Sequence, residues 1–358
     1  MRVEGKDLTT IWYDESEDHI KIIDQTFLPF KIKIKTLKSF NDSVLAIKNM
    51  LVRGAPLIGV TAAYGMYLAS KQDTSDKYLL KAAELLKKTR PTAVNLQWSV
   101  DKIISEIKKT INNRPQLILS LANKIREEDI VSCSKIGDNG LHLIEDIYKN
   151  KRSTVNVLTH CNAGWLATVD WGTALSPIFK ANRKNIPIHV WVDETRPRNQ
   201  GFNLTAWELM NEGISNSLIV DNAGGHVMQK GDVDLCITGT DRTTLNGDVC
   251  NKIGTYLKAL AAYDNKIPFF VAAPTSSIDF SIIDGLKNIP IEERNSEEVS
   301  TIYGMNSKGK IDKIRIVPEK AQCKNYAFDV TPAKYITKII TEKANVDPTT
   351  ESISSLLK

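Results

Sequence analysis

The sequence is poor in the residues that build metal cages and disulfide frameworks. It contains only five cysteines and five histidines among 358 residues. The cysteines are odd in number, none is spaced as CxxC, and the histidines form no HExxH motif, so we expect no metal site and no disulfide-stapled fold. A reducing environment suits such a chain best, which favours a cytoplasmic location.

Long apolar runs are missing as well. The first ten residues, MRVEGKDLTT, lack the apolar core of a signal peptide, and the uncharged stretch 54–70 falls short of the ~20 residues of a membrane span. The 47 basic and 42 acidic residues leave a formal charge of only +5. We therefore expect no membrane and no nucleic-acid partner.

The motifs of nucleotide sites are absent too. No GxxxxGK[ST] occurs and no GxGxxG follows a strand, so we expect no nucleotide cofactor, and in fact no cofactor at all. Two glycine-containing segments remain, RGAP (53–56) and GDVCNKIG (247–254). Their backbone N–H groups could bind a phosphate, or the glycines could simply form tight turns.

What is present predicts an α/β fold. Hydrophobic residues make up 42% of the chain and charged residues 25%, as in an ordinary folded protein. After residue 151, short apolar runs alternate with stretches long enough for crossover helices. The runs are 154–160, 186–193, 216–221, 233–241 and 267–275. This rhythm predicts a Rossmann-like parallel sheet in a C-terminal domain.

The first third of the chain has a different pattern. It predicts a smaller, mixed and mainly helical N-terminal domain, with residues 1–127 as one domain and 128–358 as the other. We expect helices over 43–70, interrupted at 53–56, and then over 76–88, 100–110 and 117–148. The last of these should be broken or loosened near Gly137–Gly140.

Polar residues follow each predicted strand of the sheet. The segments are His160–Gly164, Asp193–Arg198, Asp221–His226, Gly239–Arg242 and Pro274–Ser277. Because ligands of open parallel sheets bind at the carboxyl ends of the strands, these segments should converge on one crevice. The alternative is that they are ordinary polar loops.

Several of these residues could carry chemistry. Cys161 could be a nucleophile, an acid–base group or a small packing residue. Asp241 could form an ion pair with Arg242, or act as an acid if burial raises its pKa. His160 and His226 are further candidates, although a lone histidine is more often structural.

In their order along the chain, longer motifs resemble the methylthioribose-1-phosphate isomerase family. They are DQTFLP (24–29), RGAPLIGVTAAYG (53–65), RPTAVNLQWSVD (90–101), LTHCNAGWLATVDWGTAL (158–175), DETRPRNQG (193–201), LTAWEL (204–209), DNAGGHVM (221–228), GTDRTTLNGDVCNKIGTY (239–256), PFFVAAPTSSID (268–279), IPIEER (289–294) and FDVTPA (328–333). The wider family includes ribose-1,5-bisphosphate isomerase and regulatory subunits of the translation-initiation guanine-nucleotide exchange factor.

The resemblance implies roles for individual residues. Cys161 falls on the family's catalytic cysteine and Asp241 on its proton donor. The positions of substrate-binding residues fall on Arg53, Gly54, Ala55, Arg90, Gln200, Asn251 and Lys252. The sequence departs from the family pattern at Thr240, Gly224, Phe202 and around Trp165–Trp171, which leaves the fine shape of the pocket open.

The resemblance also implies an activity. We expect an aldose–ketose isomerase of methionine salvage that converts 5-methylthio-α-D-ribose 1-phosphate to 5-methylthio-D-ribulose 1-phosphate and works as a homodimer on a small sugar phosphate. Two alternatives remain: a ribose-1,5-bisphosphate isomerase, and a non-catalytic regulatory subunit that binds sugar phosphates or nucleotides.

Overall fold

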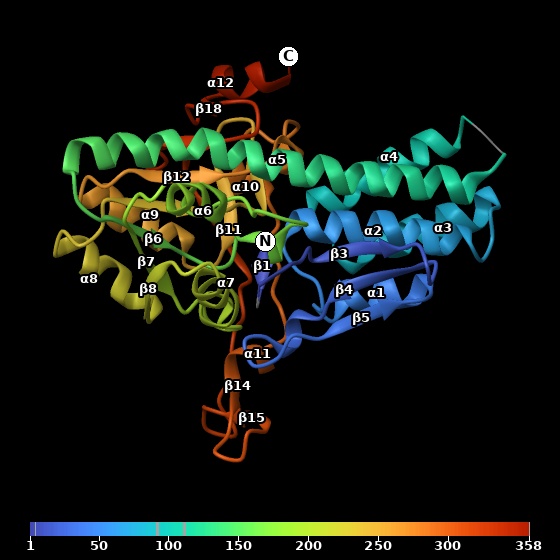
Figure 1. Cartoon of the computed structure of the whole chain (residues 1–358), viewed down its shortest axis with the longest axis horizontal. Coiled ribbons are helices and arrows are strands. Elements are labelled where there is room, and N and C mark those ends of the chain that lie inside the picture. Colours follow the sequence, from blue (N-terminus) through green and yellow to red (C-terminus); the bar gives the residue numbers. More distant parts are fainter. Residues whose placement is uncertain (4, 91–92, 110–111, 358) are drawn as a thin grey trace.

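The computed structural model describes residues 1–3, 5–90, 93–109 and 112–357. Its longest element is helix α5 (Arg114–Lys151), whose 38 residues span about 57 Å at 1.5 Å per residue. The helix runs along both halves of the molecule (Figure 1). It packs against α2 (Ala55–Ser70) and α4 (Val94–Ile107) in one half and against α6 (Leu175–Arg183) in the other.

Helix α5 is continuous through Gly137–Gly140, so the predicted break there is wrong. A Cβ atom on Gly137 would lie 2.2 Å from Ser176 Oγ, and one on Gly140 would lie 2.4 Å from Pro177 Cγ. Both glycines therefore let α6 approach α5 closely. A glycine inside a helix costs about 1 kcal/mol relative to alanine, and the packing of α5 against α6 offsets this cost.

The N-terminal half is mixed and mainly helical, as predicted. Its remaining elements are α1 (Phe40–Lys48), α3 (Asp76–Thr89) and an antiparallel sheet of β3 (Ile11–Asp14), β4 (His19–Ile23) and β5 (Ile34–Leu37). Every residue of α2 except Pro56 is buried, because this apolar helix is surrounded by α1, α3, α4 and α5. The helix expected over 100–110 begins earlier, at Val94, and residue 110 lies outside the described part.

The C-terminal half contains the predicted parallel sheet. Its strands are β6 (Val155–Thr159), β7 (Ile188–Asp193), β8 (Ser215–Ile219), β9 (Leu235–Thr238), β12 (Phe269–Ala272), β17 (Lys338–Ile340) and β18 (Asn345–Val346). They lie in the order β18-β17-β12-β9-β6-β7-β8, and only β17 and β18 pair antiparallel. All five predicted strands are therefore confirmed, each within a few residues.

Helices cover both faces of this sheet. Val157 and Ile237 point to the face packed by α5 and α6, whereas Leu158 and Cys236 point to the face packed by α8 (Gly224–Gln229) and α9 (Thr255–Asp264). Successive residues of a strand face opposite sides, so strands that are apolar on both sides require two covering layers. The Rossmann-like α/β prediction is confirmed.

The strand order reverses between β6 and β9, since β7 and β8 lie on one side of β6 while β9 and β12 lie on the other. At such a switch point the loops leave in opposite directions and open a crevice. A second sheet leads on from β9 beside this crevice. It pairs β13 (Ile278–Asp279), β10 (Arg242–Thr244), β11 (Val249–Lys252) and β16 (Phe328–Thr331).

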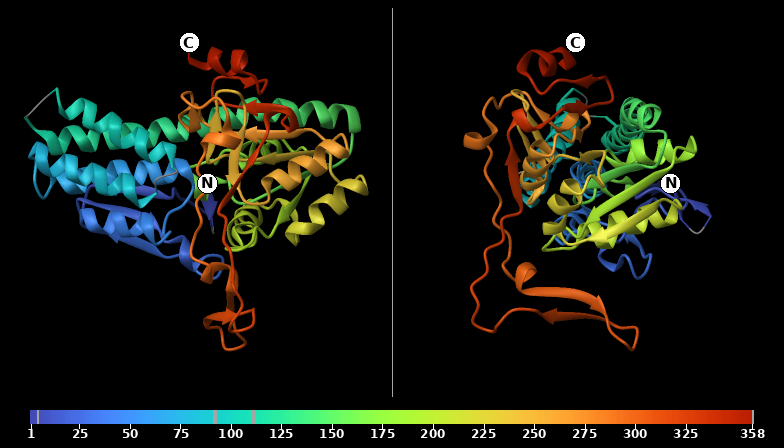
Figure 2. Two further views of the ribbon diagram at one scale, coloured as in Figure 1. Left: turned by 180° about the vertical axis from the view of Figure 1, so that it is seen from behind. Right: turned by 90° about the vertical axis from the view of Figure 1, so that its left-hand side faces the viewer.

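A hairpin of β14 (Thr301–Met305) and β15 (Ile311–Arg315) projects from the body as an arm (Figure 2). The short helices α7 (Ala206–Asn211), α10 (Gly285–Asn288), α11 (Glu297–Ser300) and α12 (Thr350–Ser354) complete the fold. Among the described helices, none has the length and apolar character to cross a membrane. The proposed boundary after residue 127 falls within α5, and the division into two domains stays a prediction.

Candidate active site

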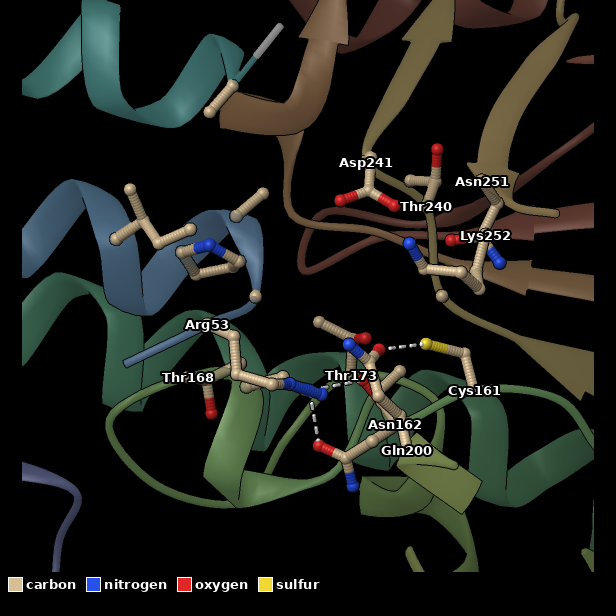
Figure 3. A pocket seen from close by; sticks show the side chains of 18 of the residues that line it. Arg53, Cys161, Asn162, Thr168, Thr173, Gln200, Thr240, Asp241, Asn251 and Lys252 are labelled. Atoms are coloured by element: carbon tan, nitrogen blue, oxygen red, sulfur yellow. Dashed lines mark hydrogen bonds between the residues drawn. The ribbon is translucent and has the colours of Figure 1, made fainter. Parts of the chain in front are cut away.

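One cavity at the switch point, part of which Figure 3 shows, is lined by every residue to which the family resemblance assigns a catalytic or substrate-binding role. These are Arg53, Gly54, Ala55, Arg90, Cys161, Gln200, Asp241, Asn251 and Lys252. The cavity is lined by both apolar and polar side chains, as sites for small molecules usually are. The roles assigned to these residues stay predictions.

Cys161 is the second residue after β6, and its backbone is left-handed, with φ of 68°. Its N–H donates to Thr195 Oγ1 (2.8 Å), and its thiol donates to Gln200 Oε1 (2.9 Å). Desolvation raises the pKa of the thiol, while the positive charges of Arg53 and Lys252 oppose that rise. These two hydrogen bonds fix the orientation of the Cys161 thiol in the wall of the cavity.

Asp241 lies across the cavity from Cys161, at the carboxyl end of β9 (Figure 3). Its N–H donates to Cys250 O (3.0 Å), which ties it to the second sheet. Desolvation raises the pKa of its carboxyl, against the opposing charges of Lys252, Arg90 and Arg53. Its neighbour Arg242 pairs with Asp279 at 3.5 Å. Burial therefore makes this carboxyl easier to protonate than that of an exposed aspartate.

Two buried arginines bring unsatisfied donors to the cavity. Arg53 donates through Nη2 to Asn162 Oδ1 (2.6 Å) and Asn162 O (3.0 Å), but its Nε and Nη1 have no hydrogen-bond partner among the described residues. Arg90 Nη1 likewise has no hydrogen-bond partner within the described chain, whereas its Nε forms an ion pair with Glu292 Oε2 at 3.8 Å. Buried N–H groups without partners are costly, so both side chains suit an anion.

The first turn of α2 faces the same space. Gly54, its N-cap, has φ of 86°, and a Cβ there would lie 2.3 Å from Ala167 O. The backbone can therefore make this turn only with glycine, which brings the helix N-terminus and its free N–H groups to the cavity. Lys252 adds a third cationic group, with Nζ 3.0 Å from Ala327 O.

His160 also lines the cavity, but both its ring nitrogens are already used. Nδ1 lies 2.9 Å from Asp193 Oδ2, and Nε2 lies 2.8 Å from Ile253 O. The other histidine considered, His226, is exposed on α8. These positions give His160 a structural role.

One cluster in the described part of the chain has the donor types of a metal site: His160, Asp193 and Asp221. Lys258 Nζ lies 3.3 Å from Asp193 Oδ2, and the Asp221 carboxylate accepts the N–H groups of Thr195 and Arg196. The Lys258 ammonium already offsets one of the two carboxylates, and backbone N–H groups occupy the other, so the cluster fits a fixed ion-pair network better than a cation site.

Sequence reasoning missed two residues beside the cavity. Asn162 accepts from Arg53, and Glu208 is fully buried and accepts from Asn162 Nδ2 at 2.8 Å. Both lie within recognised motifs, CNAG and LTAWEL, yet spacing alone does not show that they touch. A glutamate inside an otherwise apolar helical stretch is the one signal that could have marked Glu208.

Fold and cavity together define a Rossmann-like α/β protein with a thiol and a carboxyl facing an anion-accepting cavity at the switch point. A sequence model of the Initiation factor 2 subunit family matches residues 51–348. The chain belongs to this family.

Within it, the chain is similar to curated methylthioribose-1-phosphate isomerases. It is 56% identical to that of Escherichia coli, over 96% of this chain and 93% of the relative, and 53% identical to that of Rhizobium meliloti, over 99% of both. Among solved structures, 5-methylthioribose 1-phosphate isomerase from Pyrococcus horikoshii superposes with a TM-score of 0.84 at 39% identity, covering 98% of this chain and 96% of that one.

A structure described as translation initiation factor eIF-2B, subunit delta, from A. fulgidus is also similar. It has a TM-score of 0.79 at 38% identity, covering 98% of this chain and 99% of that one.

Proposed function

We propose that this protein is an aldose–ketose isomerase that converts 5-methylthio-α-D-ribose 1-phosphate to 5-methylthio-D-ribulose 1-phosphate in methionine salvage. The observation that carries the proposal is the placement of Cys161 and Asp241 on opposite sides of one cavity that also holds unpartnered arginine N–H groups. The names of its full-length relatives support the same substrate.

The phosphate group of the substrate fits the basic side of the cavity. Among the described residues, Arg53 Nε and Nη1 and Arg90 Nη1 have no hydrogen-bond partner, and the planar fork of a guanidinium suits the oxygens of a phosphate. Lys252 and the first turn of α2 add positive charge at the same place. Binding of the phosphate would also satisfy donors that are otherwise buried without partners.

The reaction has a specific difficulty, because the phosphate on the anomeric oxygen prevents spontaneous ring opening. An acid must protonate the ring oxygen while the bond from C1 to that oxygen breaks. Asp241, whose carboxyl has a raised pKa, can supply that proton. Hydrogen then moves from C2 to C1, and the C2 hydroxyl becomes the ketone as it loses its proton.

Two routes for this hydrogen transfer remain open. In the first, Cys161 acts as a base in its thiolate form, which the positive charges of Arg53 and Lys252 favour against desolvation. The thiolate removes the C2 proton, and the enol phosphate is reprotonated at C1. In the second, the hydrogen moves as a hydride, and the thiol stabilises the cationic transition state. Turnover in D₂O separates them, because only the first route allows solvent deuterium to enter C1.

Substitution of the two reacting groups tests the proposal. We expect Cys161→Ser and Asp241→Asn each to lower kcat by at least ~100-fold, the scale of a lost acid–base group. Thermal unfolding should stay within a few degrees of the wild type. Near-normal turnover in either folded variant contradicts the role assigned to that residue.

Ribose 1,5-bisphosphate is the alternative substrate. It would need a second cationic subsite, whereas the lining of the cavity also includes the apolar side chains of Met50, Ile58, Ala93 and Phe328. An apolar wall favours a methylthio group over a phosphate. A comparison of kcat/KM for the two sugars identifies the preferred substrate, and a higher value for the bisphosphate contradicts the proposal. A purely regulatory role would predict no turnover of either sugar.

We further propose that the enzyme acts as a homodimer in the cytoplasm. The five cysteines are all unpaired, which suits a reducing compartment. Sedimentation equilibrium of the purified protein tests the dimer, and cell fractionation tests the compartment.

A further inference from the structure

Glu208 is a buried carboxylate beside the cavity that the reaction scheme above does not use. It lies on α7 with no exposed surface, and it faces three N–H donors. Asn162 Nδ2 lies 2.8 Å from Oε1, Trp165 N lies 2.8 Å from Oε2 and Leu166 N lies 3.2 Å from Oε1. The chain passes so close that a Cβ on Gly164 would lie 1.8 Å from Oε2.

Asn162 connects this carboxylate to Arg53. Its Nδ2 donates to Glu208 and to Thr205 Oγ1 (3.1 Å), while its Oδ1 accepts from Arg53 Nη2 (2.6 Å). Burial raises the pKa of the Glu208 carboxyl to about 7, whereas the N–H donors of Asn162, Leu166 and Trp165 favour its ionised form. The ionised carboxylate only accepts hydrogen bonds, so it forces the NH₂ end of the Asn162 amide toward itself. The oxygen of the amide must then face Arg53. With the amide reversed, its NH₂ would face a guanidinium, donor against donor.

The direction of Arg53 depends on this arrangement. Its Nη2 is held by Asn162, and its Nε and Nη1 remain without partners in the described chain. A planar guanidinium held at one nitrogen presents its other N–H groups in fixed directions.

We propose that Glu208 is a positioning residue, which sets the orientation of the Asn162 amide and through it aims the free N–H groups of Arg53 at the phosphate of the substrate. This inference rests on the proposed function for the identity of the substrate. The hydrogen-bond chain itself predicts an effect on the binding of any phosphate.

The isosteric variant Glu208→Gln tests the proposal. Its NH₂ group would face the donors of Asn162 or the backbone, so the amide of Asn162 loses its enforced orientation. We expect KM for 5-methylthioribose 1-phosphate to rise at least tenfold, with kcat within threefold of the wild type. A merely structural role would lower kcat and thermal stability together.

A second variant reverses the polarity of the chain. In Glu208→Gln/Asn162→Asp, the aspartate accepts from Arg53 on one oxygen and from the NH₂ of the new glutamine on the other, while the glutamine oxygen still accepts from Trp165 N. Only Leu166 N, whose hydrogen bond to Oε1 is the longest of the three at 3.2 Å, loses its acceptor. We expect KM to return to within about threefold of the wild type. Glu212→Gln, at the end of the same helix and paired with Arg183 at 3.4 Å, is the matched control and should leave KM unchanged.

Each outcome decides. A wild-type KM in Glu208→Gln, or a double variant no better than the single one, overturns the proposal. If Glu208→Gln does not fold, the double variant decides alone, and failure of both to fold overturns it too. If the wild type does not turn over the sugar, the proposed function fails. The positioning role can still be tested by calorimetry with inorganic phosphate, for which we expect the affinity to be highest in the wild type, lower in the double variant and lowest in Glu208→Gln.

Discussion

At the residue scale, the titratable side chains of the cavity are buried, and burial disfavours the charged form of each. Desolvation raises the pKa values of Cys161 and Asp241 and lowers those of Arg53, Arg90 and Lys252. Their charges partly offset one another, since each acid lies near at least two of the cations. A bound phosphate would change this balance by adding negative charge beside the arginines.

Arg53→Lys tests whether the shape of the guanidinium matters beyond its charge. A lysine keeps the positive charge but cannot bond Asn162 and a phosphate oxygen through separate nitrogens of one plane. We expect KM to rise by about ten- to hundredfold, the equivalent of about 1.4–2.7 kcal/mol. Steady-state kinetics check this, with Lys71→Arg, on the surface beside Asp18, as the control; an unchanged KM contradicts the role of the fork.

At the scale of elements, the site is assembled from the ends of helices and strands. The N-terminus of α2, the carboxyl ends of β6 and β9, and β11 each contribute one part of the cavity wall. Such ends are fixed by the packed elements behind them, so the reactive groups depend on rigid supports rather than on free loops. The turn at Gly54 is an example, because it leaves no room for a side chain beside Ala167.

Gly54→Ala should disturb both fold and binding. Alanine at this position would have an unfavourable positive φ, and its Cβ would clash with Ala167. We therefore expect the free energy of unfolding to fall by at least about 2 kcal/mol. KM should rise because the first turn of α2 shifts. Gly213→Ala has a similar φ of 68° but nothing within 4 Å of its Cβ, so urea unfolding of both variants separates the clash from backbone strain. Equal losses contradict the clash.

At the scale of the whole molecule, α5 and the sheet join the two halves around buried polar groups. Asp129 on α5 is half-buried and accepts from Val169 N at 2.7 Å, and desolvation raises the pKa of its carboxyl to about 7. Its folded-state pKa exceeds the unfolded value of 3.8. The stability it contributes is therefore complete below pH 3.8 and is lost as pH rises to about 7.

Asp129→Asn should remove this dependence. Asparagine keeps an oxygen for Val169 N and carries no charge, so the variant should gain stability relative to the wild type between pH 4 and 7. The relative gain approaches about 1.4 kcal/mol per pH unit. Urea unfolding at pH 5, 6, 7 and 8 measures it, and a difference that does not change with pH contradicts the buried-acid interpretation.

The parallel sheet, the N-terminal helices and the motifs of the site could be predicted from the sequence, because they depend on local patterns. The apolar runs that form β6, β7, β8, β9 and β12 predict strands by themselves. Three of the five polar segments line the cavity, namely His160–Gly164, Gly239–Arg242 and Pro274–Ser277, whereas Asp193–Arg198 and Asp221–His226 do not, so the prediction of one crevice for all five is only partly confirmed. The continuity of α5 could not be predicted, because Gly137 and Gly140 are typical of a helix break in the sequence. Only the structure shows that they allow α6 to approach α5 closely.

The sequence by itself therefore determined the class of fold, the family and the residue types available for chemistry. Only the tertiary structure decided which of them meet: Cys161 with Gln200, Arg53 with Asn162, and Asn162 with Glu208. Positions 53, 162 and 208 are far apart along the chain, and no local pattern encodes a hydrogen bond between them. The physical reason is that charge, desolvation and hydrogen-bond direction act through space, where the packing of the elements sets the distances.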